Sequence, residues 1–407
     1  MSMDPLSRRD FLKVGAAAGA AVTVVPALAQ ESQPAAEAGK AQPPLATRKL
    51  GKTGVAVSML NQGTVDPVTE RHLNIMHDEG VRYIDTARSY ADAKNETIIG
   101  EWFAKTGHRK EYFLVTKDSP RTPDQWVEKL DQRLETLKTD YIDLFFIHGL
   151  GDDRRGIANV EEAPRSKEWA AAADKMRKSG KVRFVGFSAH CDIKLRTTLI
   201  RNAADGGWVD AVMPATDLKL MRDNKEFNDA LDKCHKAGVG LIAMKTCKGD
   251  MQGVKLVDAF VKKGLNAYTA ILAAVWTDER FASICSHMNN VTKLKENVAA
   301  ARSFKPLTPE ELAMVHEMLD GVRRTYCVAC DGSCRRAAGT NADLNTIARY
   351  VSYLEEGGRL KEVRAMFRAL PPEARDWSGA DLLAASHACR CKLDFATILN
   401  TARERLA

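Results

Sequence analysis

Several features that would point to a particular class of function are missing from this sequence. Lys and Arg number 60 against 53 Asp and Glu, and the net charge of +7 is small for 407 residues, so nucleic-acid binding is not expected. No Cys-x-x-Cys-His motif is present, which gives no indication of covalently attached haem. The turn after the first expected strand, 61–66 (NQGTVD), has no Gly-x-Gly-x-x-Gly motif, which disfavours an open, doubly wound sheet.

The N-terminal segment lacks an apolar run long enough for a comfortable membrane span, yet it has the pattern of an export signal. Arg8 and Arg9 are followed by Phe-Leu-Lys and then by an apolar stretch over 14–29 that ends in Ala-Leu-Ala. We predict that residues 1–29 are a twin-arginine signal peptide. An uncleaved N-terminal anchor is the alternative interpretation.

A signal of this type predicts the twin-arginine export machinery as a partner. The protein is then expected to be periplasmic or otherwise exported, with no stable membrane span after cleavage. Because this route exports folded proteins, a cofactor could be bound before export. Residues 30–46 are rich in Pro, Ala and polar residues without a period, which predicts a flexible linker.

From residue 47 onward, short apolar segments alternate with longer amphipathic ones, which predicts βα units and a parallel sheet. The expected strands are 57–60, 82–85, 112–116, 141–147, 182–187, 208–213, 239–244 and 281–286. The expected helices are 69–79, 96–105, 123–137, 167–178, 193–203, 226–236, 265–275 and 291–301. Eight such units match the size of a closed (β/α)₈ TIM barrel, an α/β fold that we assign to 47–305.

Residues 306–407 are expected to form a C-terminal α-helical extension that contains cysteines. Thr308, Pro309 and Glu311 have the order of a helix N-cap, a first helical residue and the acid of a capping box. Further helices are expected over 344–355, 361–370 and 393–406.

Four polar side chains stand at the ends of neighbouring expected strands. Asp85 ends the second strand and Tyr90 lies on the loop beyond it, while Lys117 and His148 end the third and fourth strands. The carboxyl ends of barrel strands share one face, so these residues are expected to lie close together. A neighbouring ammonium stabilises the phenolate form of a tyrosine, whose free pKa is about 10. The four residues therefore predict a tyrosine that protonates a developing alkoxide, while a hydride comes from elsewhere.

Residues 47–302 resemble the aldo-keto reductase family in several motifs that follow one another in the family's order. These are 48–54 (RKLGKTG) with Val57 and Ser58, 83–87 (YIDTA) with Tyr90, Glu96 and Gly100, 140–144 (DYIDL) with His148, 181–188 (KVRFVGFS), and 241–245 (LIAMK). The resemblance implies a barrel that reduces a small aldehyde or ketone with NADP(H).

The resemblance also implies a role for each site residue. Tyr90 would be the general acid, Lys117 and Asp85 the pair that tunes it, and His148 the group that orients the substrate. The implied cofactor-binding residues are Ser188, Lys245, Glu296 and Asn297.

Three positions depart from the family's pattern. Ala91 replaces the glycine that usually follows the tyrosine, 213–217 (MPATD) replaces the usual Gln and Tyr-Asn residues, and 286–288 (SHM) replaces a small turn. The tyrosine site is therefore expected to be intact, while the dinucleotide site is expected to be partly rebuilt.

The extension has a Cys-x2-Cys-x3-Cys cluster of Cys327, Cys330 and Cys334, followed by Cys389 and Cys391. It resembles a ferredoxin-like extension found on some aldo-keto reductases, but the spacing differs and the proline is missing, so it resembles a degenerate form. A 4Fe-4S cluster, a zinc site, and a remnant with free or disulfide-bonded thiols are the three interpretations. The other cysteines, Cys191, Cys234, Cys247 and Cys285, are expected to be small core residues.

Two other functions remain as alternatives to the NADP(H)-dependent reductase. One is a non-catalytic binding barrel whose cofactor site has decayed. The other is an iron–sulfur electron-transfer protein that uses the cysteines of the extension.

Overall fold

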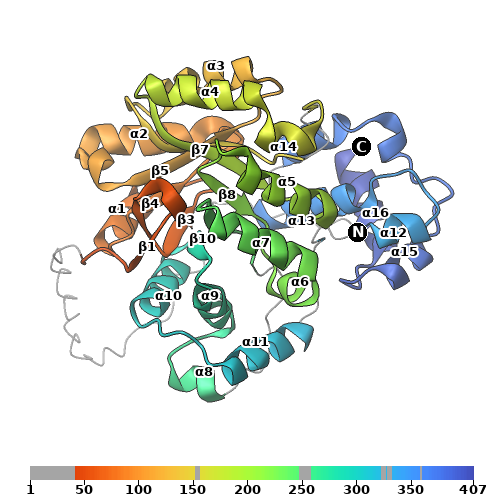
Figure 1. Ribbon diagram of the computed structural model, residues 1–407. Helices are drawn as coiled ribbons and strands as arrows, with labels where there is room; N and C mark the ends of the chain where they lie inside the picture. Colours follow the sequence, from red (N-terminus) through yellow and green to blue (C-terminus); the bar gives the residue numbers. More distant parts are fainter. Residues whose placement is uncertain (1–41, 152–155, 247–257, 322–326, 328–331, 358–359) are drawn as a thin grey trace, which may run out of the picture. The chain divides into compact units, whose positions relative to one another are not determined.

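A closed barrel of eight parallel strands forms the centre of the part of the chain that the structure describes (Figure 1). In this computed structural model, the described residues are 42–151, 156–246, 258–321, 327, 332–357 and 360–407. The barrel strands are β3 (Leu60–Gly63), β4 (Tyr83–Asp85), β5 (Phe113–Asp118), β6 (Ile142–Ile147), β7 (Val182–Ala189), β8 (Ala211–Pro214), β9 (Gly240–Ala243) and β10 (Phe281–Ser286). They follow the order β10-β3-β4-β5-β6-β7-β8-β9 around the barrel, so the expected TIM-barrel class is confirmed.

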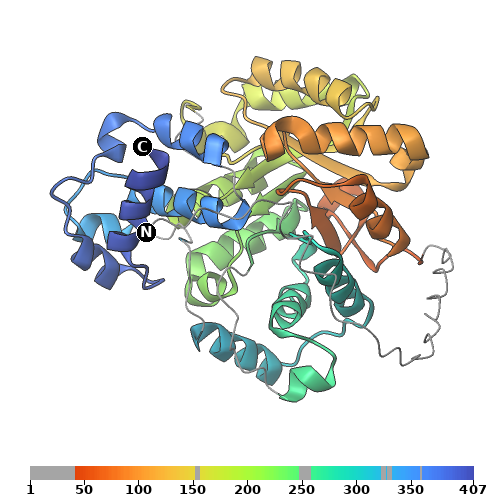
Figure 2. The same ribbon diagram turned by 180° about the vertical axis from the view of Figure 1, so that it is seen from behind.

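Helices lie around the outside of these strands, as both ribbon views show (Figures 1 and 2). They are α1 (Glu70–Asp78), α2 (Lys94–Thr106), α3 (Pro123–Thr136), α4 (Lys167–Lys178), α5 (Ile193–Gly206), α6 (Leu218–Asp223), α7 (Lys225–Lys236), α8 (Asp258–Lys262), α9 (Ala267–Thr277), α10 (Val291–Arg302) and α11 (Pro309–Gly321). Side-chain caps fix several helix starts; Thr122, for example, accepts a hydrogen bond from the backbone N–H of Gln125 at the start of α3.

The predicted strand over 57–60 is wrong in its bounds. β1 (Thr47–Lys49) and β2 (Ala56–Ser58) form an antiparallel pair with Arg48 opposite Val57, and the first barrel strand begins only at Leu60. Val57 and Leu50 are both buried in the apolar cluster that fills the barrel interior. Their burial explains why this segment is as apolar as a barrel strand without being one.

The barrel has two apolar layers because successive side chains of a strand point to opposite faces. On β6, Leu144 and Phe146 belong to the interior cluster, while Phe145 and Ile147 belong to the larger cluster between strands and helices. A strand buried on both faces holds its end in place, and the polar residues of the site lie at such ends.

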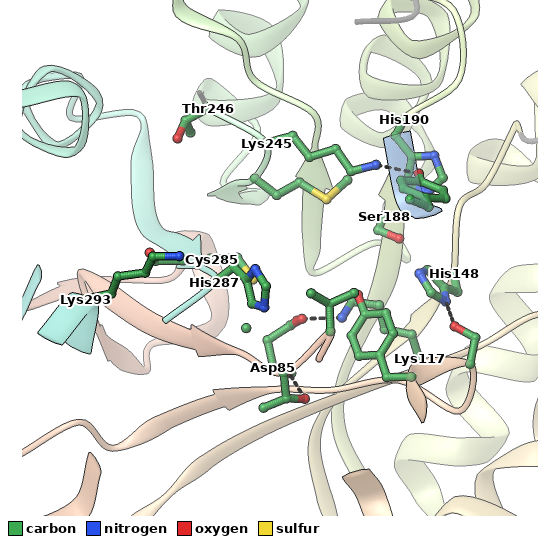
Figure 3. A pocket seen from close by; sticks show the side chains of 18 of the residues that line it. Asp85, Lys117, His148, Ser188, His190, Lys245, Thr246, Cys285, His287 and Lys293 are labelled. Atoms are coloured by element: carbon green, nitrogen blue, oxygen red, sulfur yellow. Dashed lines mark hydrogen bonds and ion pairs between the residues drawn. The ribbon is translucent and has the colours of Figure 1, made fainter. Parts of the chain in front are cut away.

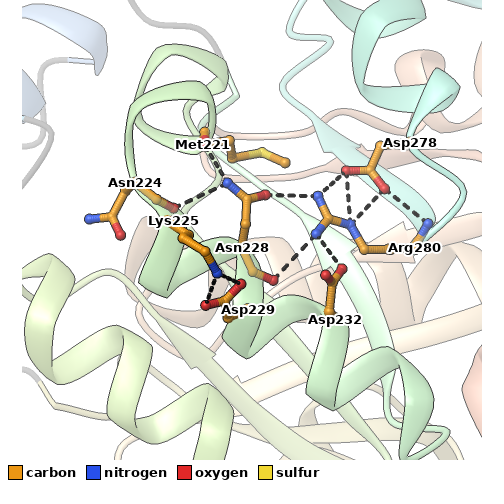
Figure 4. Close-up of polar contacts among 8 residues, drawn as sticks. All are labelled: Met221, Asn224, Lys225, Asn228, Asp229, Asp232, Asp278 and Arg280. Atoms are coloured by element: carbon orange, nitrogen blue, oxygen red, sulfur yellow. Dashed lines mark hydrogen bonds and ion pairs between the residues drawn. The ribbon is translucent and has the colours of Figure 1, made fainter.

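A polar network fastens α7 to the turn before β10 (Figure 4). The Arg280 guanidinium donates to Asp278 at 2.6 Å, to Asp232 at 2.8 Å and to the side-chain oxygen of Asn228 at 3.0 Å. Asn228 in turn donates to the carbonyl of Met221. Arg280 precedes β10, so this network lies away from the carboxyl ends of the strands.

The part of the extension that follows α11 has its own apolar core. Its helices are α12 (Ser333–Ala337), α13 (Leu344–Gly357), α14 (Leu360–Arg368), α15 (Leu382–Ala388) and α16 (Phe395–Leu406). Tyr350, Val363 and Phe367 are among the residues buried in this core. Between barrel and extension, the capping box expected at α11 is present, since Thr308 and Glu311 each accept a hydrogen bond from the other's backbone N–H. Among the described helices, none is long and apolar enough to cross a membrane.

Candidate active site

A cavity of about 700 Å³ opens at the carboxyl ends of the barrel strands (Figure 3). The residues predicted from sequence to be catalytic or cofactor-binding all line it: Asp85, Tyr90, Lys117, His148, Ser188, Lys245, Glu296 and Asn297. The volume is within the usual range for small-molecule sites, about 300–1,000 Å³. The structure thus brings together side chains that are spread over more than two hundred positions of the chain.

Asp85 and Lys117 form an ion pair at the floor of this cavity. Both side chains are 1% exposed, and the Lys117 ammonium also donates to the carbonyl of Thr86 at 2.9 Å. Burial alone lowers the pKa of Lys117, but the charge of Asp85 outweighs it and the pKa lies above its ordinary value. Burial raises the pKa of Asp85, and the Lys117 ammonium opposes that shift. The lysine is therefore held protonated at neutral pH.

Tyr90 lies between this ion pair and a histidine. The Lys117 ammonium is 5.1 Å from the centre of the Tyr90 ring, and the His148 ring meets that ring edge-on at 5.7 Å. His148 is fixed from its backbone, which donates to the carbonyl of Asp118 at 2.7 Å, and its Nδ1 lies 3.3 Å from the Ser89 hydroxyl. The tyrosine thus has a cation on one side and an imidazole on another.

The backbone after Tyr90 is strained. Ala91, Asp92 and Ala93 have φ values of 49°, 55° and 65°, in the left-handed region that residues with a side chain rarely adopt. Such conformations persist where the surrounding structure enforces them, often at functional sites. The replacement of the family's usual glycine by Ala91 therefore leaves the loop in the conformation that favours glycine.

The four residues predicted to bind the cofactor also line the cavity. Ser188 is 1% exposed and accepts a hydrogen bond from the backbone N–H of Gly149 at 2.9 Å. Asn297 donates to the Ser286 hydroxyl at 2.9 Å, and Glu296 accepts from the Asn266 amide at 3.0 Å. Lys245 follows β9 with a φ of 54°, and its Nζ donates to the Tyr353 hydroxyl at 3.0 Å.

Sequence reasoning missed several residues that line the cavity. Cys285, expected in the core, is half-buried beside Asp85, and burial, reinforced by that carboxylate, raises the pKa of its thiol. Its position at the end of β10 was the signal that could have placed it here. His190 follows β7 in the same way, with its ring centre 6.3 Å from that of His148. His287 pairs with Asp66 at 3.0 Å. Tyr353 and Glu362 come from the extension, and nothing in their local sequence indicates a site.

Among the residues that depart from the family's pattern, Met213 is buried in the barrel interior, whereas Ser286 and His287 line the cavity. The rebuilt turn after β10 therefore contributes directly to the site.

The described cysteines of the extension are buried in its apolar core. Cys327, Cys334, Cys389 and Cys391 are all buried in the apolar core of the extension, while Cys330 lies outside the described residues. A hydrogen bond from the Cys391 thiol, followed by backbone N–H groups of Leu393, Cys391 and Lys392, lowers the pKa of Cys389 to about 6. A metal centre there stays a prediction.

Comparison with known proteins gives two matches to sequence families. The Aldo/keto reductase family matches residues 57–320, and the twin-arginine translocation pathway signal sequence matches residues 5–25. The "Uncharacterized oxidoreductase YqkF" of Bacillus subtilis is 30% identical over 306 residues, covering 65% of this chain and 94% of the relative. "Aldo-keto reductase yakc [NADP(+)]" of Schizosaccharomyces pombe is 34% identical over 183 residues, covering 42% of this chain and 46% of the relative.

Solved structures resemble the barrel part of the chain. Aldo-keto reductase AKR11C1 from Bacillus halodurans, in its holo form, has a TM-score of 0.53 at 20% identity and covers 67% of this chain and 96% of its own. An aldo/keto reductase from Klebsiella pneumoniae in complex with NADP and acetate has a TM-score of 0.52 at 23% identity, covering 67% and 94%. At these identities the likeness establishes the fold.

Proposed function

This chain belongs to the aldo-keto reductase family of oxidoreductases, and from that premise we propose that it reduces an aldehyde or ketone by hydride transfer from NADP(H), with Tyr90 as general acid. The observation that carries the proposal is the buried ion pair of Asp85 and Lys117 beside Tyr90. An ion pair excluded from water can stabilise charge that develops next to it, such as the negative charge on a carbonyl oxygen during reduction.

Each residue of the site has a distinct part in this chemistry. Tyr90 gives its proton to the carbonyl oxygen, and the Lys117 ammonium stabilises the phenolate that remains. Asp85 keeps Lys117 charged and in place. His148, held by its backbone and by Ser89, donates a hydrogen bond that orients the carbonyl. Bound NADP(H) would supply the hydride to the carbonyl carbon.

The lining of the cavity fits a dinucleotide. Ser188 and Asn297 offer hydrogen-bonding groups for the amide and the adenosine parts. Lys245, Lys293 and His287 offer a cation or an N–H to phosphate groups. The N-terminus of α10, where Asn290 caps the helix, adds a partial positive charge near the turn after β10.

The test compares two tyrosine variants of the full chain. Tyr90→Phe should lower kcat for a panel of aldehydes and ketones by about 10²–10⁴-fold, because it removes the transferable proton. NADPH binding, followed by its fluorescence, should be retained. Tyr141→Phe is the matched control, since Tyr141 precedes β6 at the opposite end of the barrel and its ring faces Arg109. Undiminished reduction by Tyr90→Phe would contradict the role of Tyr90.

The same titration separates the reductase from a binding barrel with a decayed cofactor site. A chain that binds neither NADPH nor NADP⁺ would favour the binding barrel. For the compartment, we propose export by the twin-arginine route to the periplasm, supported by the match over residues 5–25. Fractionation of cells that produce the full chain, with an Arg8→Lys, Arg9→Lys control, tests it.

For the extension, we propose a bound metal, either an iron–sulfur cluster or zinc, held by cysteines of the 327–334 and 389–391 segments. The burial of four thiols in one small apolar core supports it, since thiolates are ligands of both. Metal analysis and visible absorption of the protein, as isolated from its native compartment, test whether the extension holds iron, zinc or no metal. A colourless preparation without iron or zinc would leave a remnant with thiols or disulfides, and would remove the electron-transfer alternative.

A further inference from the structure

The extension supplies one wall of the cavity that contains Tyr90. Tyr353 of α13 lines the cavity, together with Glu362, Ala365 and Met366 of α14 and with Ala369 just after it. The residues from α14 recur at intervals of three and four, so they lie on one side of that helix. The other side carries Val363 and Phe367, which are buried in the extension's own core. The wall is thus backed by a packed layer.

Two polar contacts from α13 reach the ends of barrel strands. The Arg349 guanidinium, which is 4% exposed, donates to the carbonyl of His190 after β7 at 3.0 Å. The Tyr353 hydroxyl accepts from the Nζ of Lys245 after β9 at 3.0 Å. Residues 349 and 353 are four apart on the helix, so one face of α13 makes both contacts. The extension therefore touches the barrel at the rim of the cavity, beside residues that line it.

Lys245 is directed into this contact by its backbone and by its partner. Its φ of 54° is uncommon for a residue with a long side chain. Its ammonium lies 5.2 Å from the centre of the Tyr353 ring, in addition to the hydrogen bond with the hydroxyl. A lysine side chain is otherwise flexible, and ordering it on a ligand has an entropic cost. A tyrosine that already orders the ammonium reduces that cost.

We infer that Tyr353 is a positioning residue for dinucleotide binding, which holds the Lys245 ammonium where it contacts a phosphate group of NADP(H). The inference rests on the proposed function, and it gives the extension a part in that function. The Tyr353 hydroxyl is neutral, so its hydrogen bond places no negative charge on the Lys245 ammonium. The extension thereby raises the affinity for the cofactor, which suits a chain that carries an export signal and would leave the compartment where the cofactor is made.

A double-mutant cycle on the full chain tests this inference with NADPH as the probe. NADPH fluorescence gives Kd for the wild type, Tyr353→Phe, Lys245→Met and the double variant. Lys245→Met should weaken binding by roughly tenfold or more, and Tyr353→Phe by about three- to tenfold. Because Tyr353 acts through Lys245, the second substitution should change Kd by less than about twofold when Lys245 is already Met. Raising the ionic strength should reduce the effect of Lys245→Met.

Tyr141→Phe is the control, and thermal unfolding of every variant establishes that the fold is kept. Additive effects in the cycle would overturn the inference and leave the reductase intact. So would a Tyr353→Phe variant that binds NADPH like the wild type and is altered only in KM for the carbonyl substrate, because that result places the contact on the substrate side. Failure of the wild type to bind NADPH would overturn both this inference and the proposed function.

Discussion

Asp85→Asn separates the charge of the buried pair from its shape. The amide has nearly the same size as the carboxylate, but it leaves the Lys117 ammonium, 1% exposed, without a counter-charge. Removing one partner of a buried ion pair costs about 3–5 kcal/mol of unfolding free energy. We expect a loss of this order at pH 7, measured by thermal or denaturant unfolding.

The pH dependence of the same variant is more specific. In the wild type the pKa of Lys117 is raised by Asp85 despite burial, so its contribution to stability is complete below the unfolded pKa of about 10.4 and is constant between pH 7 and 9. In the variant the charge of Asp85 is gone, and burial, the largest single influence on Lys117, is opposed only by Tyr90 and Cys285, so we expect its pKa to fall below the unfolded value. The unfolded chain then binds the additional proton, and unfolding free energy rises with pH by up to about 1.4 kcal/mol per pH unit. Carbonyl reduction should fall along with the charge on Lys117.

Asp229→Asn is the matched control, because the pair of Lys225 and Asp229 lies on the exposed face of α7 (Figure 4). Its unfolding should remain close to that of the wild type at every pH. The reasoning is refuted if Asp85→Asn is as stable as Asp229→Asn, or if its stability does not change between pH 7 and 9.

Two further predictions concern residues near the site. Ala91→Gly should stabilise the fold by about 0.5–1 kcal/mol, because glycine accepts a φ of 49° without strain. The control Ala171→Gly, in the exposed part of α4, should destabilise the fold by about 1 kcal/mol. Denaturant unfolding measures both, and two losses of equal size would contradict the strain at Ala91. Burial raises the pKa of Glu96 to about 7, although Arg133 and Thr116 oppose this shift. Between pH 4.5 and 7 the native state therefore binds one proton that the unfolded chain releases. The unfolding free energy should fall by up to about 3 kcal/mol as pH rises through this range. Glu96→Gln should abolish that fall, and an unchanged slope in melting temperature against pH would show that Glu96 is not its source.

Local patterns were enough to predict the barrel and the positions of Asp85, Tyr90, Lys117 and His148. Each of these residues follows or ends a strand whose apolar pattern is plain, and parallel strands bring such ends to one face. The first barrel strand was misplaced because β2 and β3 are separated only by Met59, and both contain residues that are buried. Apolar character alone does not distinguish a strand that covers the end of a barrel from one that builds it.

The extension's part in the site could not be predicted in this way. Tyr353 meets Lys245 across 108 positions, and that contact depends on how α13 packs on the barrel rim rather than on any local pattern. The position of Cys285 at the end of β10 indicated the cavity, but its place beside Asp85 depends on the closure of β10 onto β3. Long-range packing decides both cases.

The wall formed by α13 and α14 has a consequence for the order in which the site is made. Tyr353 leaves the ribosome 56 residues after Asn297, roughly 3–11 s later at about 5–20 residues per second. During that interval the barrel strands, all earlier in the chain, can already pair, but the cavity still has an open side. The strands that carry Asp85, Lys117 and His148 can therefore pair before the cavity has all its walls, and synthesis of α13 and α14 is the step that completes it.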